Sequence, residues 1–221
     1  MAREGFQRDL ELLQDQMLEL GSMVDRAIDR ALTALLERNI PLAEAVVRDD
    51  GEVNRMRYDI DTSCVNLLAQ QAPVAGDLRV VVSVLSIIGE LERIGDHAEG
   101  IARIVIMMAD EPLVKPLVDI PRMADRAQQM LRDALTAFTE GDVAAAHRVG
   151  EADDVVDELQ DRVYHDLIEI MLRDPSAVLA CTHLLRVSHN LERIADRATN
   201  VAERAVFAAT GTQTEMNIST Y

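Results

Sequence analysis

The residues best suited to chemistry are acidic side chains that recur at intervals of four in two stretches of the sequence. Glu92 and Asp96 are four residues apart, and the series Glu192, Asp196 and Asn200 repeats that interval. Residues four apart lie on one face of an α-helix, where like charges repel each other unless a cation compensates. The pattern therefore favours a cation-binding helical face.

Each of these series has a partner row earlier in the same half of the chain. Asp50 is followed by Asn54, and Asp153 is followed by Asp157. Because neighbouring helices pack about 8–10 Å apart, we expect paired rows to face each other across a shallow groove and to supply only oxygen donors. Such donors favour a hard cation, such as Mg²⁺, Ca²⁺, Mn²⁺ or oxidised iron, and exclude soft thiolate chemistry.

Spacing alone does not establish such a site. Asp25 and Asp29 have the same interval without a counterpart in the second half, and acidic helical faces are usually solvated. The rows of Glu92 and Glu192 differ because both recur and both have a partner row. The main alternative is that neighbouring arginines neutralise the carboxylates by ion pairing, namely Arg93, Arg193 and Arg197.

Other catalytic groupings find little support. A ferritin-type di-iron bundle needs Glu-x-x-His on two helices, and no histidine here has a glutamate three residues before it. His165 and Asp166 would match the central dyad of an HD-type phosphohydrolase, with His147 and Asp196 as outer ligands, but a chance dipeptide explains the match. The sequence has no glycine-rich phosphate loop and no Ser-His-Asp or Cys-His grouping.

Composition excludes several classes of partner. The 221 residues include 22 Lys+Arg and 39 Asp+Glu, a net charge of −17, with three Phe, three Tyr and no Trp. Such a chain should repel nucleic acid and anionic lipid and lacks aromatics that stack on bases. Two cysteines without a CxxC motif, no apolar leader and no membrane-length apolar window predict a cytoplasmic protein, peripheral to membranes only through partners.

Apolar residues at intervals of three or four predict three long amphipathic helices in the first half. The first helix runs from Phe6 to Leu35 and the second over about 41–71. The third follows the break at Pro73 and ends at about residue 109. Pro41 and Pro73 separate these helices. Three further prolines predict an extended connector over 111–121.

The second half of the sequence repeats the first. The hexapeptide LERIGD at 91–96 recurs as LERIAD at 191–196, and an offset of 103 carries Asp50 and Val53 onto Asp153 and Val156. We therefore predict an all-α fold of two tandem pseudo-symmetric three-helix bundles with six long antiparallel helices. The expected units are a first repeat over 1–110, a proline-rich linker over 111–121, a second repeat over 122–210 and a mobile tail over 211–221.

From about residue 6 to residue 211 the chain resembles the PhoU family. The resemblance rests on the run QQAPVAGDLR at 70–79 and on the two Leu-Glu-Arg-Ile-x-Asp motifs. It implies two three-helix bundles and a regulator of phosphate uptake with multinuclear metal clusters held by Glu/Asp-x-x-x-Asp motifs. It also implies partners, the ATPase subunit of the phosphate ABC transporter and the phosphate sensor histidine kinase, with the starvation response restrained when phosphate is plentiful. We further expect a homodimer.

Carried over residue by residue, the resemblance implies iron, manganese, magnesium or zinc at two sites. The ligands would be Asp153, Asp157, Glu192, Asp196 and Asn200 in the second repeat, and Asp50, Asn54, Glu92 and Asp96 in the first. The first repeat has Asn54 where the family usually has a carboxylate and Gly100 where it usually has asparagine. Glu99 could compensate, although it points about 100° away from Gly100 around the helix axis. We expect the first site to be weaker or differently loaded.

Three functions are compatible with these residues. The first is a non-enzymatic adaptor, because the sequence shows no nucleophile or general base. The alternative is a metal-dependent phosphohydrolase that uses the same carboxylates to polarise a phosphoryl group and activate water. A purely structural helical scaffold, which would bind neither metal nor phosphate-dependent partners, is the third.

Overall fold

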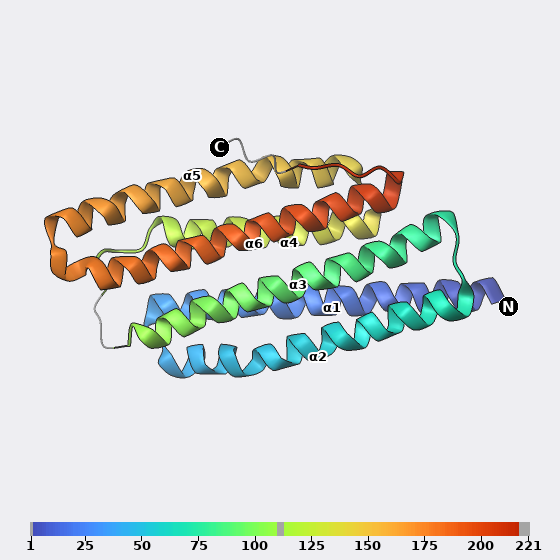
Figure 1. Ribbon diagram of the computed structural model, residues 1–221, viewed down its shortest axis with the longest axis horizontal. Helices are drawn as coiled ribbons and strands as arrows, with labels where there is room; N and C mark the ends of the chain where they lie inside the picture. The colour runs from blue at the N-terminus through green and yellow to red at the C-terminus, as the bar shows by residue number, and fades with distance from the viewer. Residues whose placement is uncertain (1, 110–112, 217–221) are drawn as a thin grey trace.

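The computed structural model describes residues 2–109 and 113–216, and these ranges form six α-helices and one 3₁₀ turn without any strand (Figure 1). The elements are α1 (Ala2–Glu37), α2 (Ile40–Gln71), α3 (Ala75–Met107), α4 (Asp119–Glu140), α5 (Val143–Arg173), η1 (Pro175–Ala177) and α6 (Val178–Thr210). The predicted all-α fold of two three-helix repeats is confirmed. Residues 110–112 of the predicted first repeat and linker, and 217–221 of the predicted tail, lie outside the described residues.

Local sequence sets the turns between the helices. Asn39 caps α2 by accepting a hydrogen bond from the backbone N–H of Leu42 (3.1 Å), with Pro41 in the first turn, where its missing N–H costs nothing. In the second repeat Asp142 caps α5 in the same way, through Ala145 (2.9 Å), and Gly141 supplies the left-handed residue that ends α4. The turn chemistry is therefore repeated along with the helices.

The helix α4 is shorter than its counterpart α1, with 22 residues against 36. It begins at Asp119, within the segment predicted as linker, because Pro121 can occupy the first turn of a helix. The preceding connector is tethered to α5 by an ion pair between Lys115 and Asp166. The duplication thus did not reproduce the first turns of α1 in the second repeat.

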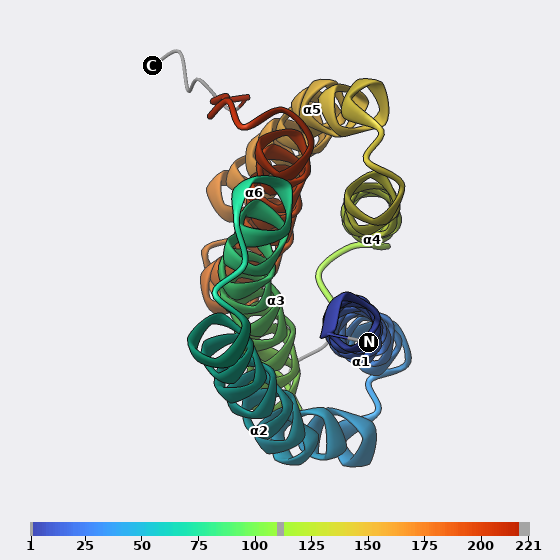
Figure 2. The same cartoon turned by 90° about the vertical axis from the view of Figure 1, so that its right-hand side faces the viewer.

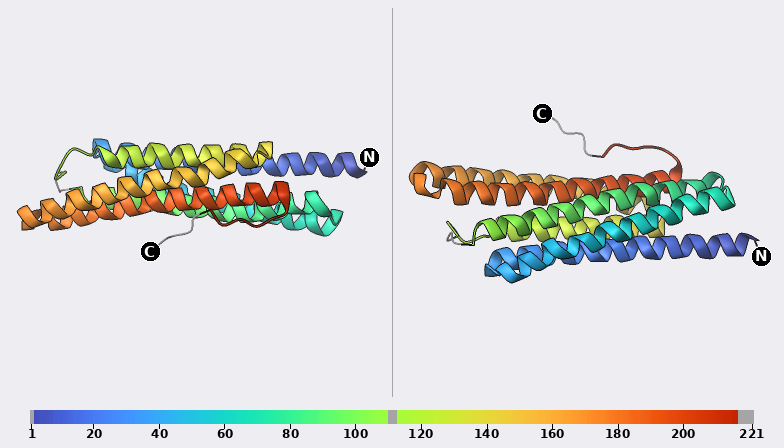
Figure 3. Two further views of the ribbon diagram at one scale, coloured as in Figure 1. Left: turned by 90° about the horizontal axis from the view of Figure 1, so that it is seen from above. Right: turned by 60° about the horizontal axis from the view of Figure 1, so that its bottom comes forward.

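The two repeats join through α3 against α6 and α1 against α4 (Figure 2). Both bundles are elongated and lie side by side (Figure 3). The helices α3 and α6 run antiparallel, since Arg79 Nε donates to the carbonyl of Ala208 (3.2 Å) while Ser83 Oγ, one turn later, donates to that of Arg204, one turn earlier (3.4 Å). A contact made by a residue of α3 is therefore expected to have a counterpart in which the roles of α3 and α6 are exchanged.

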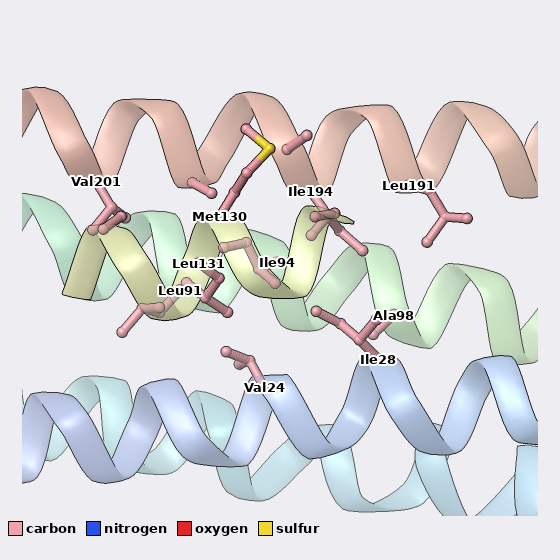
Figure 4. Close-up of a cluster of buried hydrophobic side chains, with 14 of the residues drawn as sticks. Val24, Ile28, Leu91, Ile94, Ala98, Met130, Leu131, Leu191, Ile194 and Val201 are labelled. Atoms are coloured by element: carbon pink, nitrogen blue, oxygen red, sulfur yellow. The ribbon is translucent and has the colours of Figure 1, made fainter. Parts of the chain in front are cut away.

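A single apolar core runs through all six helices. Figure 4 shows its centre, where Ile94 of α3 lies near Ile194 of α6, with Leu91 and Leu191 on either side, all four fully buried. These are the apolar residues of the two LERIxD motifs. The motifs therefore supply the joint between the repeats as well as the acidic residues beside it.

The described residues also bear on membrane crossing and on the two cysteines. No helix among the described residues is long and apolar enough to cross a membrane. Cys64 and Cys181 are both buried and form no disulfide, as expected from their places in apolar helical patterns.

Truncating a side chain at the joint should destabilise the whole chain. Leu191→Ala removes a fully buried side chain and is expected to lower the free energy of unfolding by about 2–5 kcal/mol, measured by urea denaturation. Leu172→Ala is the matched control, because that side chain is 80% exposed and its loss should change stability by less than about 0.5 kcal/mol. Similar effects of the two substitutions would contradict a shared core at α3 and α6.

Candidate metal site

The second acidic row lies where α5 packs against α6. Asp153 of α5 is buried, whereas the side chains of Glu192 and Asp196 on α6 are only 18% and 23% exposed. Charges of Asp157, Asp196 and Glu192 all act on Asp153. The four carboxylates that the sequence assigned to this site are therefore neighbours, contributed by two helices.

Electrostatic strain is pronounced in this second row. Burial, followed by repulsion from Asp157, raises the pKa of Asp153 to about 7. Burial and the charge of Asp196 raise the pKa of Glu192 to about 7, despite the nearby guanidinium groups of Arg193 and Arg197. Partial desolvation and Asp196 also raise the pKa of Asp157. Because like charges are held together at a partly dry surface, a bound cation would relieve the repulsion.

The first row lies at the corresponding contact, where α2 packs against α3. Burial raises the pKa of Asp50 to about 6, with contributions from Glu99, Asp96 and Glu92. Asn54, which stands where the second repeat has Asp157, donates its Nδ2 hydrogen bond to Asp50 Oδ2 (2.9 Å). At this position the first row therefore has an amide donor in place of a carboxylate.

Glu99 lies close enough to the first row for its charge to act on Asp50 and Asp96, so the prediction that it could compensate for Gly100 still stands. After desolvation, Glu99 is the largest contributor raising the pKa of both Asp50 and Asp96. It also forms an ion pair with Arg103 (2.5 Å). The sequence held a signal for this position, because Glu99 is three residues after Asp96. Residues three apart share a face of a helix, as residues four apart do. The second repeat has Thr199 at this place.

Sequence reasoning also missed Glu90, which lies at the contact between α3 and α6. Its Oε2 accepts hydrogen bonds from Asn200 Nδ2 (3.1 Å) and Arg197 Nη1 (3.3 Å) of α6. Asn200, predicted as a ligand, thus directs its amide toward α3. At the pseudo-equivalent place, Asn190 Oδ1 lies 3.0 Å from His97 Nδ1.

Arginine pairing, the structural alternative, accounts for part of the second row. Arg193 contacts Asp196 (Nη1–Oδ2, 3.3 Å) and Glu192 (Nε–Oε2, 3.7 Å). Arg93 and Arg197 are instead directed to Glu90. Arg193 therefore pairs with two carboxylates of the row, and the pKa of Glu192 stays raised beside it.

The donor set suits a hard cation. Only oxygen donors were assigned to either row, and Glu192 Oε2 is buried without a hydrogen bond, although His189 Nδ1 lies 3.3 Å away. Within residues 2–109 and 113–216, no three His, Cys, Asp or Glu side chains are already arranged to hold a metal ion. Ligation would therefore require the carboxylates to rotate toward a common point.

A cavity of about 190 Å³ adjoins the first row. It lies between α1 and α2 and reaches α3 at Gly95, with Arg26 and Arg30 on one side and Asp50 on the other. A Cβ atom at Gly95 would lie 3.4 Å from Asp50 Oδ1. Ala195 takes the corresponding place in the second repeat.

Comparisons with known proteins agree on one family. The protein-family model described as PhoU domain matches residues 17–105 and 120–205. The phosphate-specific transport system accessory protein PhoU homolog of Aquifex aeolicus is 38% identical over 92% of this chain and 92% of its own, and that of Clostridium acetobutylicum is 35% identical over 98% and 100%.

Two crystal structures have the same fold. PhoU from Pseudomonas aeruginosa superposes with a TM-score of 0.89 at 32% identity, covering 94% of this chain and 100% of that one. The phosphate transport system regulatory protein PhoU from Streptococcus pneumoniae gives 0.88 at 30% identity, with 95% and 99% covered. Both repeats therefore have solved counterparts.

The raised pKa values predict how the stability of the metal-free protein depends on pH. Asp50, Asp153 and Glu192 bind protons more tightly in the folded chain than in the unfolded one. The unfolded state therefore binds fewer protons between about pH 4 and 7, and stability should fall as pH rises through this window. Urea midpoints at about pH 5 and 8 in the presence of chelator test this.

The matched variant for this pH experiment is Asp153→Asn with Glu192→Gln. It removes two of the titrating groups, so its midpoint should fall less between the two pH values than that of the parent. An equal or larger fall would show that the repulsion lies elsewhere.

Proposed function

The chain belongs to the PhoU family, and from this premise we propose that it is a regulatory accessory protein of a phosphate transport system. The observation that carries the proposal is the match over both repeats to relatives named as phosphate-specific transport system accessory proteins. Family likeness over a whole chain is stronger support than a fold alone, because the motifs and the fold coincide.

The proposed mode of action is docking rather than catalysis. The protein would work in the cytoplasm as an adaptor between the ATPase subunit of the phosphate ABC transporter and the phosphate sensor histidine kinase, and would form a homodimer. Its long helices offer extended side faces to such partners (Figure 3). A ligand can shift docking only by its differential affinity for two states, and metal or phosphate occupancy is the proposed source of that difference.

The acidic rows are the proposed metal sites. The second row would bind the metal ions more tightly, because it holds Asp157 where the first row has the amide donor Asn54. In the first row, Glu99 would add a carboxylate that the second lacks. Iron, manganese, magnesium and zinc, bound as multinuclear clusters, are the proposed occupants. When bound, the metal supplies positive charge that holds the two helices of each groove together.

Isosteric substitutions test these sites. Glu192→Gln with Asp196→Asn should lower the affinity for Mn²⁺ by more than about tenfold, since even outer-shell partners of metal sites are worth 10–100-fold. Equilibrium dialysis with elemental analysis measures the bound metal. The matched control is Asp15→Asn with Glu19→Gln, an exposed pair at the same interval on α1, which should leave binding unchanged.

The corresponding change in the first row tests the asymmetry. Glu92→Gln with Asp96→Asn should remove a smaller share of the bound metal. Equal losses from the two double variants would contradict the asymmetry, and a parent protein without bound metal would contradict both sites. If Mn²⁺-dependent phosphomonoester turnover disappeared in the Glu192→Gln/Asp196→Asn protein, the phosphohydrolase would replace the adaptor.

The regulatory role is tested in cells. Deletion of the gene should switch on the phosphate-starvation response in phosphate-rich medium, measured with a reporter of a starvation-induced gene, and the intact chain should restore repression. Affinity capture from phosphate-rich and phosphate-starved cells should recover the transporter ATPase or the kinase in phosphate-dependent amounts. A reporter that stays repressed in the deletion strain would contradict the proposal.

A further inference from the structure

After α6 the chain turns back and runs beside α5 and α6 (Figures 1 and 2). Gly211 ends α6 with a left-handed φ of 79° and donates its N–H to the carbonyl of Phe207 (2.8 Å). Arg79 of α3 lies over this glycine, because a Cβ atom there would be 3.4 Å from its Nη1. The turn therefore has a fixed direction, and residues 212–216 follow it.

Two contacts hold Met216 against the second repeat. Its backbone N–H donates to Glu203 Oε1 of α6 (2.8 Å). Its side chain covers Gly150 of α5, where an added Cβ atom would lie 3.0 Å from Met216 Cβ and 3.3 Å from its Sδ. Glycine is unfavourable inside a helix, and the close approach of Met216 is a packing reason for this one.

These contacts lie at one end of the second acidic row. Glu203 is seven residues after Asp196, so it shares a face of α6 with that carboxylate. Gly150 is three residues before Asp153, about 4.5 Å along α5. The segment thus lies against α5 and α6 one or two turns beyond the carboxylates of the row.

The first repeat fills the same place with its own side chains. By the offsets of 103 and 100, Val47 corresponds to Gly150 and Arg103 to Glu203. Arg103 forms an ion pair with Glu99, so the end of the first row carries a valine and a paired arginine. In the second repeat Gly150 and Glu203 stand there, and Met216 supplies the apolar group and the hydrogen-bond donor.

We propose that residues Gly211–Met216 form a releasable strap, which docks against α5 and α6 and covers the end of the second acidic row. Release of the strap uncovers this end of the second row and frees Glu203 together with the notch at Gly150. This inference requires no bound metal, so it stands or falls separately from the proposed metal sites.

The strap is suited to release because few contacts hold it. Thr212, Gln213 and Glu215 are exposed, and Thr212 N–H bonds only to Thr210 Oγ1 at the start of the turn (3.0 Å). Methionine is a flexible side chain that tolerates being exchanged for another apolar group. Segments with few buried contacts open at low free energy while the core stays folded.

Amide hydrogen exchange of the full chain tests the docking. The Met216 amide should be protected, and Gly150→Val should abolish that protection, with exchange about tenfold faster, the factor expected for one hydrogen bond to a charged group. Gly51→Val is the matched control, since that helical glycine has open space around it, and it should leave Met216 unchanged. A Met216 amide that exchanges in the parent protein as fast as in a free peptide would overturn the strap.

A second pair of variants keeps the test independent of any packing defect caused by valine. Glu203→Ala should abolish the protection of Met216, whereas Glu203→Gln, which retains a carbonyl acceptor, should preserve most of it. Equal exchange in the two variants would overturn the assigned hydrogen bond.

Carbodiimide labelling of carboxylates tests the closure. Deleting residues 212–221 should increase labelling of Glu203 several-fold and leave Glu99 of the first row unchanged. Unchanged labelling of Glu203 would show that the segment closes nothing.

Discussion

The antiparallel packing of α3 against α6 determines where everything else in the molecule lies. Each LERIxD motif places its leucine and isoleucine on one helical face and its acidic residues about 100–140° around the helix. Leu91, Ile94 and their counterparts in α6 are fully buried in the shared core. Burial of these side chains therefore fixes the direction in which Glu92 and Glu192 must point, toward the grooves that α2 and α5 complete.

The contacts between α3 and α6 differ at two pseudo-equivalent places, and the residues on both helices differ together. Glu90 is met by Arg197 and Asn200, whereas its counterpart Asn190 is met by His97 beside Gly100. An acid in a largely buried contact needs a positive charge or several hydrogen-bond donors, whereas a neutral amide needs hydrogen-bond partners but no opposite charge. The substitutions at these positions are therefore coupled across the pseudo-twofold contact, and the glycine at position 100 reflects the space taken by Asn190 as well as any change at the first row.

Each acidic row lowers the stability of the metal-free protein. Grouped carboxylates at a partly desolvated surface are destabilising unless they are protonated or compensated, and a chain with a net charge of −17 gains nothing in solubility by concentrating acid in its grooves. Carboxylates retained at such a cost are typical of a binding site. The two acidic rows have different neighbours, which are Glu99 and Arg103 at the first row and Met216 and Glu203 at the second. The two copies of this site therefore differ in accessibility.

The sequence by itself determined the helices, their duplication and the family, because the periodicity of apolar residues and the turn residues are local signals. It also located Asp50, Asp96, Asp153, Asp157, Glu192 and Asp196, since an interval of four fixes a helical face. Only the tertiary structure decided that Asn200 turns to Glu90 and that Met216 lies on Gly150. Each of these contacts joins side chains whose approach depends on how separate elements pack and rotate against each other, and one helix's periodicity carries no information about that.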